Sequence, residues 1–298
     1  MKKVLSVLLS LTIAFAMAQE RVGVPKAISH DPGCVGFVMT NMDGTVVTAD
    51  DLIESILGEG VVHSNVVFAG LSGASVASAG LFTGGMAAGI GIEEGIVLSS
   101  GYITYAIGPN TAVNTTAVLN LPGDAQLNTL IPGYSTNDAT TLQFDFVPDF
   151  TTLYLQYVFG SEEYLEYVNS VYNDVFGFFL NGNNIALIPS TTTPVSINNV
   201  NHLLNTSYFV NNTSATYCTE MDGFTTVLTA SASVTPNATN TIKLGVADAG
   251  DDVLDSWVFI KGESFGGVDP EVPVTNWALF IGIGLILVFA VIRFRRLV

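Results

Sequence analysis

Hydrophobic residues recur in short runs along most of this chain. Between residues 61 and 265 these runs are rich in Val, Ile, Leu, Phe and Thr, and they are separated by turns of Gly, Pro, Asn and Asp. The run Leu153–Phe159 is apolar at every second position and largely apolar at the positions between. Strands that are apolar on both faces are typical of packed sheets. The pattern predicts an all-β fold, a single β-sandwich or jelly-roll-like domain.

One short helix is expected at the start of this domain, in the stretch "TADDLIESILGEG". Thr48 and Asp51 have the spacing of a capping box, in which each side chain accepts a hydrogen bond from the other residue's backbone. Leu52 and Ile56 then share one helix face, and Gly58 ends the helix. We therefore place the domain at residues 48–265, after a lead segment at 19–47 and before a linker at 266–276.

The two ends of the chain predict export and anchoring. Residues 1–18 have a basic start, an apolar middle and a small-residue ending, which is the pattern of a secretory signal peptide. Residues 277–292 carry no charge and are followed by the basic tail 293–298. That combination predicts a C-terminal transmembrane helix with a cytoplasmic tail. The body would then lie outside the membrane, in the cell envelope or at the cell surface.

The charge of the exported body limits its partners. The chain has 9 Lys and Arg against 26 Asp and Glu. Only Arg21, Lys26, Lys243 and Lys261 lie outside the signal peptide and the basic tail. Nucleic acid is excluded as a partner, because binding phosphate groups requires basic residues. So acidic a body suggests bound Ca²⁺, a salt-tolerant surface, or both.

Cysteine usage allows one disulfide. The chain contains Cys34 and Cys218 and no others. An exported pair in an oxidising compartment can join, and the bridge would tie the N-terminal segment to the late part of the domain. The alternative, two unpaired thiols, stays open because sequence does not give the distance between the two Cα atoms.

Two acidic stretches could carry chemistry. Tyr157–Leu180 reads "YVFGSEEYLEYVNSVYNDVFGFFL", and "DAGDDVLDS" follows a later strand. Ca²⁺ binds six to eight oxygen atoms from carboxylates, amides and backbone carbonyls. We expect the two stretches to meet at one edge of the sandwich and to hold Ca²⁺. The candidate ligands are Glu162, Glu163, Asn173, Asp174, Asp248, Asp251, Asp252 and Asp255.

Two other interpretations of these acids remain open. They could be solvated or hydrogen-bonded to backbone N–H groups in turns. Alternatively, two of them could form the carboxylate pair of a carbohydrate-active or other hydrolase. Against catalysis, His30, His63 and His202 are the only histidines, and none lies in a recognised catalytic motif. The enzyme question stays undecided from sequence, with a non-catalytic role favoured.

Several blocks of the body resemble the bacterial choice-of-anchor L domain. They include "AGLFTGG", "GIEEGIVLSSG", "DATTLQFDFVP", "YVFGSEEYLEYVN", "NDVFGFFLNG", "DGFTTVLTA" and "KLGVADAGDDVLDSWVFIKGESF", in this order across residues 49–265. The resemblance implies export and surface anchoring, and it implies no particular chemistry. The C-terminal stretch "PEVPVTNW" is similar to the PEP-CTERM sorting signals that exosortase-type enzymes process, although it departs from the usual Pro-Glu-Pro core.

These observations predict an exported, membrane- or surface-anchored β-sandwich with a binding or adhesion role toward glycan or matrix, and with structural Ca²⁺. A patch of exposed aromatic residues such as Tyr164, Tyr167 or Tyr172 would mark a binding surface. A cleft with two facing carboxylates would instead mark a hydrolase. A purely structural envelope or surface-layer protein is the third possibility.

Overall fold

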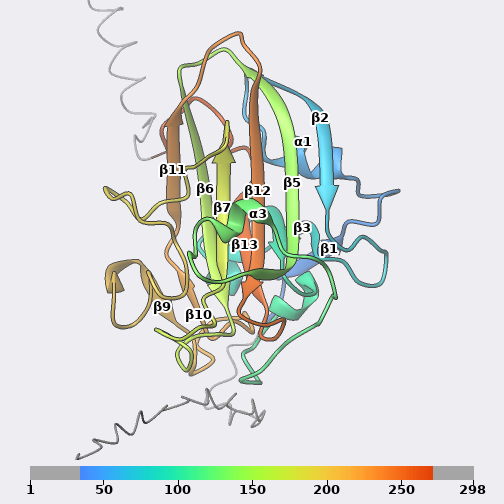
Figure 1. The fold of residues 1–298 in the computed structure, drawn as a ribbon. Coiled ribbons are helices and arrows are strands. Elements are labelled where there is room, and N and C mark those ends of the chain that lie inside the picture. The colour runs from blue at the N-terminus through green and yellow to red at the C-terminus, as the bar shows by residue number, and fades with distance from the viewer. Residues whose placement is uncertain (1–33, 271–298) are drawn as a thin grey trace, which may run out of the picture.

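Two antiparallel β-sheets pack face to face in the computed structural model, which describes residues 34–270 (Figure 1). The larger sheet has eight strands and the smaller has five. In spatial order the larger sheet contains β1 (Val38–Asn41), β3 (Ala79–Thr83), β4 (Glu94–Ser99), β13 (Ser256–Lys261), β6 (Thr152–Ser161), β10 (Gly223–Thr225) and β9 (Phe209–Asn211), and β11 (Leu228–Ser233) also pairs with β6. The smaller sheet contains β2 (Val61–Ala69), β5 (Thr136–Pro148), β12 (Asn240–Ala249), β7 (Val175–Leu180) and β8 (Asn183–Asn184). The prediction of a β-sandwich is confirmed.

The expected helix is present as α1 (Ala49–Ile56). The Asp51 backbone N–H donates to Thr48 Oγ1 at 3.2 Å, and the Thr48 backbone N–H donates to Asp51 Oδ2 at 2.7 Å. The helix buries Leu52, Ile53 and Ile56 against the sandwich. Hydrophobic periodicity did not predict the remaining helices, because each is a single turn: α2 (Gly85–Ala88), α3 (Ala125–Asn128) and the 3₁₀ turns η1 (Ile103–Ala106) and η2 (Thr206–Tyr208).

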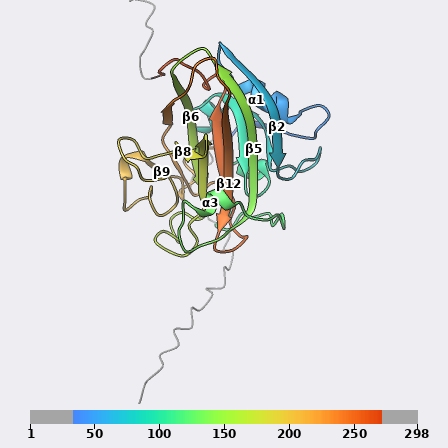
Figure 2. The same ribbon diagram turned by 45° about the horizontal axis from the view of Figure 1, so that its top comes forward.

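Apolar side chains form three layers. The central layer lies between the sheets and includes Phe144 from β5, Phe159 from β6 and Phe178 from β7. A second layer covers the outer face of the larger sheet around Trp257. A third layer lies between α3 and the outer face of β5, β7 and β12, and Figure 2 shows α3 in front of these strands. Because both faces of β6, β7 and β13 are covered, these strands are apolar at most positions.

The folded unit begins before residue 48. Strand β1 lies inside the range assigned above to a lead segment, and it pairs antiparallel with β3. Cys34 and Cys218 form a disulfide with their Cα atoms 5.2 Å apart. Cys218 and the partly buried Cys34 belong to the outer layer around Trp257, so the bridge fixes the start of the fold to that layer.

The predicted signal peptide (1–18) and transmembrane anchor (277–292) lie outside the described residues. Within residues 34–270, none of the helices has the length and hydropathy of a membrane span. Strand β13 is followed by a turn and by Phe265, which packs in the central layer.

Candidate functional site

The central apolar layer becomes polar at one end of the sandwich. On β6 the inward side chains Leu155, Tyr157 and Phe159 are followed, two residues on, by the buried Ser161. Side chains alternate between the two faces of a strand, so Ser161 continues the inward row. Two further buried serines extend inward rows of the larger sheet at this end. Ser100 follows the inward row of β4, and Ser256 precedes that of β13.

The smaller sheet contributes carboxylates to the same end. Asp248 continues the inward row of β12, and Asp174 precedes the inward row of β7. Asp138 lies near the start of β5, where the pairing with β12 shifts by one residue and Asp138 has φ +46°. All three side chains are 1% exposed. This end of the sandwich lies toward the bottom of Figure 1, on the side where β9 and β10 are drawn.

A loop at residues 111–121, here called the strap, crosses this polar end and donates its backbone N–H groups to buried acids. Ala112 N–H donates to Glu220 at 2.7 Å, and Thr115 N–H donates to Glu162 at 3.2 Å. Ala117 N–H then donates to Asp255 Oδ1 at 2.9 Å. Successive carboxylates thereby hold the strap across the strand ends.

The far end of the strap is held by Asp138. Leu121 N–H donates to Asp138 Oδ1 at 2.6 Å, and Leu119 N–H donates to Asp138 Oδ2 at 2.7 Å. Asp174 is held from within the strands, because Ala249 N–H donates to its Oδ1 at 2.9 Å and the Ser256 hydroxyl donates to its Oδ2 at 2.7 Å. For these acids, hydrogen bonding to turn and strand N–H groups supplies much of the stabilisation that sequence reasoning sought from a cation.

Asp248 differs from its neighbours. Among the described residues, neither of its carboxylate oxygens accepts a hydrogen bond of ordinary geometry, although the Ser100 hydroxyl lies close enough to favour its ionised form. Oδ2 of Asp255 is likewise buried without a hydrogen-bond partner in residues 34–270. Gly101 makes room for this carboxylate, since a Cβ atom there would lie 1.7 Å from Asp255 Oδ2.

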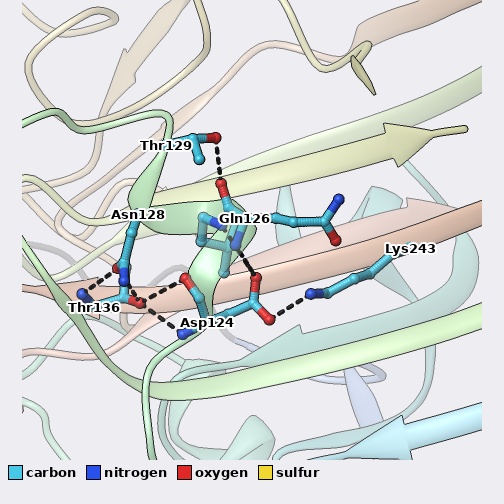
Figure 3. Close-up of polar contacts among 7 residues, drawn as sticks. Asp124, Gln126, Asn128, Thr129, Thr136 and Lys243 are labelled. Atoms are coloured by element: carbon cyan, nitrogen blue, oxygen red, sulfur yellow. Dashed lines mark hydrogen bonds and ion pairs between the residues drawn. The ribbon is translucent and has the colours of Figure 1, made fainter. Parts of the chain in front are cut away.

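No lysine reaches the polar end in the described part of the chain. Lys243 donates to Asp124, the residue that caps α3, and Figure 3 shows this contact together with the N–H of Gln126 that also donates to Asp124. Lys261 donates to Gln156 at 2.8 Å, near the opposite end of β13. Apart from Asp248, the buried acids described above are therefore stabilised by hydrogen-bond donors rather than by basic side chains.

Burial dominates the electrostatics of the cluster. It raises the pKa of Asp248 well above the usual range, and the charges of Asp174 and Asp255 raise it further. Burial raises the pKa of Asp255 to about 8, although the Ala117 N–H opposes the shift. Burial also raises the pKa of Asp138 and of Glu220, although the hydrogen bonds from the strap lower both values in part. Each shift favours the protonated form of an acid that lacks a nearby cation.

The structure brings only part of the predicted ligand set together. Asp174, Asp248 and Asp255 converge at the polar end of the sandwich, as the sequence suggested, and Glu162 and Glu163 are buried at the end of β6 beside them. Across residues 34–270, however, no three His, Cys, Asp or Glu side chains are grouped so that they could by themselves hold a metal ion.

The other predicted ligands have different surroundings. Asn173 uses its side-chain oxygen to accept from Asn198 N–H at 2.8 Å. Asp251 and Asp252 are partly exposed in the turn after β12. Asp252 acts on the cluster at longer range, through its charge on Asp138. We therefore leave these three residues out of the core of the site.

The three tyrosines proposed for a binding surface differ in their exposure. Tyr164 is fully buried, and its hydroxyl donates to the Val200 carbonyl at 2.7 Å, so its assignment to an exposed patch is wrong. Tyr167 and Tyr172 are half-buried and pack edge to face, with ring centroids 5.4 Å apart. Val171, between them in sequence, is 50% exposed. The loop that joins β6 to β7 thus presents an aromatic pair beside the polar end.

Two cavities among the described residues lie away from the polar end. One, of about 510 Å³, is lined by Gln156, Lys261 and Glu263 together with residues of the turn after α1. The other, of about 340 Å³, adjoins Glu94 and shares Glu263. Both are near the end of β13 opposite Asp255. Neither of these two cavities adjoins the acids that the sequence singled out.

Sequence reasoning missed several contributors to the polar end: Ser100, Asp138, Ser256, Glu220 and the strap. A signal existed for three of them. Ser100 follows the inward row of β4 by two residues, Ser256 precedes that of β13 by two, and Asp138 precedes that of β5 by four. Extending the alternation of each strand in the appropriate direction would therefore have placed them. The strap has no such period, because it uses backbone N–H groups rather than side chains.

Comparison with known proteins gives one match. The family model of the Choice-of-anchor L domain matches residues 40–266, which includes both sheets and every residue of the polar end. None of the curated proteins and none of the solved structures matches the chain. The family match indicates a surface-exposed protein. Because it covers most of the sequence, the chain belongs to the choice-of-anchor L domain family.

Proposed function

We propose that this protein is an exported binding or adhesion module, anchored to the membrane by residues 277–292, that attaches the cell surface to glycan or matrix. Membership of a family of surface-exposed proteins supports the location. The disulfide supports an oxidising compartment, since such bonds persist mainly outside the cytosol. The proposal includes a structural Ca²⁺ at the polar end of the sandwich.

One observation carries the binding role: the Tyr167–Tyr172 pair on the loop between β6 and β7. Tyrosine combines a large apolar ring with a polar hydroxyl, and it is enriched at binding surfaces. Sugar rings present both C–H faces and hydroxyl groups, so a partly exposed aromatic pair suits them. We assign the binding surface to these two rings and to Val171 beside them.

The neighbouring loop supports the position of this surface. Asn198 donates from its side chain to the Ser170 carbonyl at 3.0 Å, which joins the tyrosine loop to residues 194–205. Leu203 and Leu204, on that second loop, are 64% and 50% exposed. Adjacent loops that each expose apolar side chains are a common basis for ligand binding on a rigid sandwich.

The burial of the acids argues against the hydrolase hypothesis. Glu162, Glu163 and Asp255 are 1% exposed or less, which keeps them from a polymeric substrate unless the strap moves. A purely structural role is the remaining alternative, and the experiment below separates it from binding.

Binding of the purified full chain to an array of bacterial and host polysaccharides tests the proposal. The double variant Tyr167→Ala/Tyr172→Ala should lose most binding to whichever glycan the wild type retains. The matched control is Tyr102→Ala/Tyr105→Ala, which removes another edge-to-face pair, with centroids 5.2 Å apart. No glycan binding by the wild type would favour a structural role. Loss of glycan binding in the control variant alone would mean that the binding surface lies around Tyr102 and Tyr105 instead.

A further inference from the structure

Asp248 stands out because its carboxylate is buried with only the nearby Ser100 hydroxyl to favour its ionised form. It is 1% exposed, it follows the inward apolar row of β12, and neither oxygen accepts a hydrogen bond of ordinary geometry from residues 34–270. Buried carboxylates are ordinarily hydrogen-bonded or paired with a positive charge. Asp138 and Asp174, at the same end of the sandwich, follow that rule, since both of their oxygens accept N–H or O–H donors.

One carboxylate oxygen of Asp255 is buried in a similar way. Asp255 uses Oδ1 to hold the strap, and the Thr116 hydroxyl also favours its ionised form. Its buried Oδ2 accepts no hydrogen bond of ordinary geometry from the described residues. This oxygen occupies the volume that a Cβ atom at position 101 would fill. Asp174 links the two positions, because it accepts from the N–H of Ala249, next to Asp248, and from the hydroxyl of Ser256, next to Asp255. The charge of Asp255 also raises the pKa of Asp248. Three unsatisfied carboxylate oxygens are thus gathered at one place.

We propose that Asp248 and Asp255 bind a calcium ion at the polar end of the sandwich, with the Ser100 hydroxyl, backbone carbonyls and water completing its coordination. All the available ligand atoms are oxygens, which favours a hard cation over zinc or copper. Ca²⁺ accepts neutral oxygens beside carboxylates and tolerates irregular geometry. A site with two acidic ligands is compatible with the finding that no three acidic, His or Cys side chains are grouped for a metal in residues 34–270.

The ion would connect both sheets to the strap. Asp248 belongs to β12 of the smaller sheet, and Asp255 immediately precedes β13 of the larger sheet. Asp255 also accepts from Ala117 of the strap. This assignment rests on the structural role proposed above for calcium and not on the tyrosine surface, so the glycan array and the experiment below can fail independently.

The competing explanation is that protons satisfy the cluster, with Asp248 held as a neutral acid. The isosteric variant Asp248→Asn separates the two, because an amide mimics the protonated acid but is a poor substitute for a carboxylate ligand. The control is Asp252→Asn, which removes a partly exposed acid from the turn after the same strand. Both variants are made in the full chain, purified in detergent and stripped of metal with EGTA.

Metal content by elemental analysis and thermal melting are then measured with Ca²⁺, with Mg²⁺ and with EGTA. We expect Ca²⁺ at a hundredfold excess over its dissociation constant to raise the melting temperature of the wild type by roughly 5–10 °C. Mg²⁺ should act more weakly. Asp252→Asn should retain most of the Ca²⁺ shift and Asp248→Asn should lose it, while in EGTA Asp248→Asn should melt no lower than the wild type.

Two results would overturn the assignment. One is a wild type that melts at the same temperature in Ca²⁺ and EGTA and contains no metal, which would leave protons as the compensating charge. The other is an undiminished Ca²⁺ shift in Asp248→Asn, which would place the ion elsewhere on this acidic protein.

Discussion

A methyl group at position 101 should disturb the polar end of the sandwich directly. Gly101 follows β4 and lies directly against the carboxyl group of Asp255. In Gly101→Ala the new Cβ would stand 1.7 Å from Asp255 Oδ2 and 2.1 Å from its Cγ, closer than nonbonded atoms can approach. The whole carboxyl group of Asp255 must therefore move.

The cost follows from the contacts that this movement breaks. Displacing Asp255 removes the 2.9 Å hydrogen bond that Ala117 N–H donates to Oδ1. A hydrogen bond to a charged group contributes about 1.5–3 kcal/mol, and overpacking a tight core costs about 1–3 kcal/mol. Since part of the strain will relax through the strap, we expect the free energy of unfolding to fall by about 2–4 kcal/mol. The Ca²⁺-dependent part of the stability should be lost as well.

Urea unfolding of the full chain, followed by fluorescence of the fully buried Trp257, measures this change. Gly266→Ala is the matched control, because its Cβ would meet only ordinary contact, with the nearest atom 3.7 Å away in Gly58. The control should change stability by less than about 1 kcal/mol. If Gly101→Ala unfolds at the same urea concentration as the wild type, Asp255 is not held where the structure places it.

Further substitutions test three other parts of the fold by the same unfolding measurement. Tyr157→Phe removes a buried hydroxyl that has no hydrogen-bond partner in residues 34–270, so it should leave stability unchanged or raise it. Tyr164→Phe removes a hydroxyl that donates to a backbone carbonyl, and it should lower the free energy of unfolding by about 1–2 kcal/mol. Equal effects of the two substitutions would contradict the hydrogen-bond assignment. Replacing Cys34 or Cys218 with Ser should cost about 2–5 kcal/mol, and a mass spectrum with both thiols free in exported protein would refute the bridge. Thr48→Ala should cost about 1 kcal/mol, and no change would argue against the capping box.

Much of the fold could be predicted from the sequence because its signals are local. Alternating apolar positions in runs such as Leu153–Phe159 identified β6, and the spacing of Thr48 and Asp51 identified the start of α1. The one-turn helices could not be predicted in this way, since α3 has too few residues to show a helical period. Its start depends instead on Asp124, which caps the turn and accepts from Lys243, a contact between residues far apart in sequence.

The candidate site was predictable only in part. Sequence showed that acids flank aromatic strands without a nearby lysine, and Asp174, Asp248 and Asp255 do meet at one end of the sandwich. It did not show that backbone N–H groups of the strap would donate to Glu162 and Asp255, because a loop's hydrogen bonds leave no pattern in residue type. For the same reason sequence could not separate Asp248 from Asp252: both are acids near the end of β12, and only the fold buries the first.

A crystal structure of the protein grown in Ca²⁺, with anomalous data collected at long wavelength, tests the central claim most directly. The account predicts one anomalous peak at the polar end of the sandwich, within about 2.3–2.6 Å of carboxylate oxygens of both Asp248 and Asp255. The contradicting result is a peak that lies only against surface acids such as Asp252. No peak at all, with Asp248 close to a neighbouring acid at the distance of a shared proton, would also contradict it.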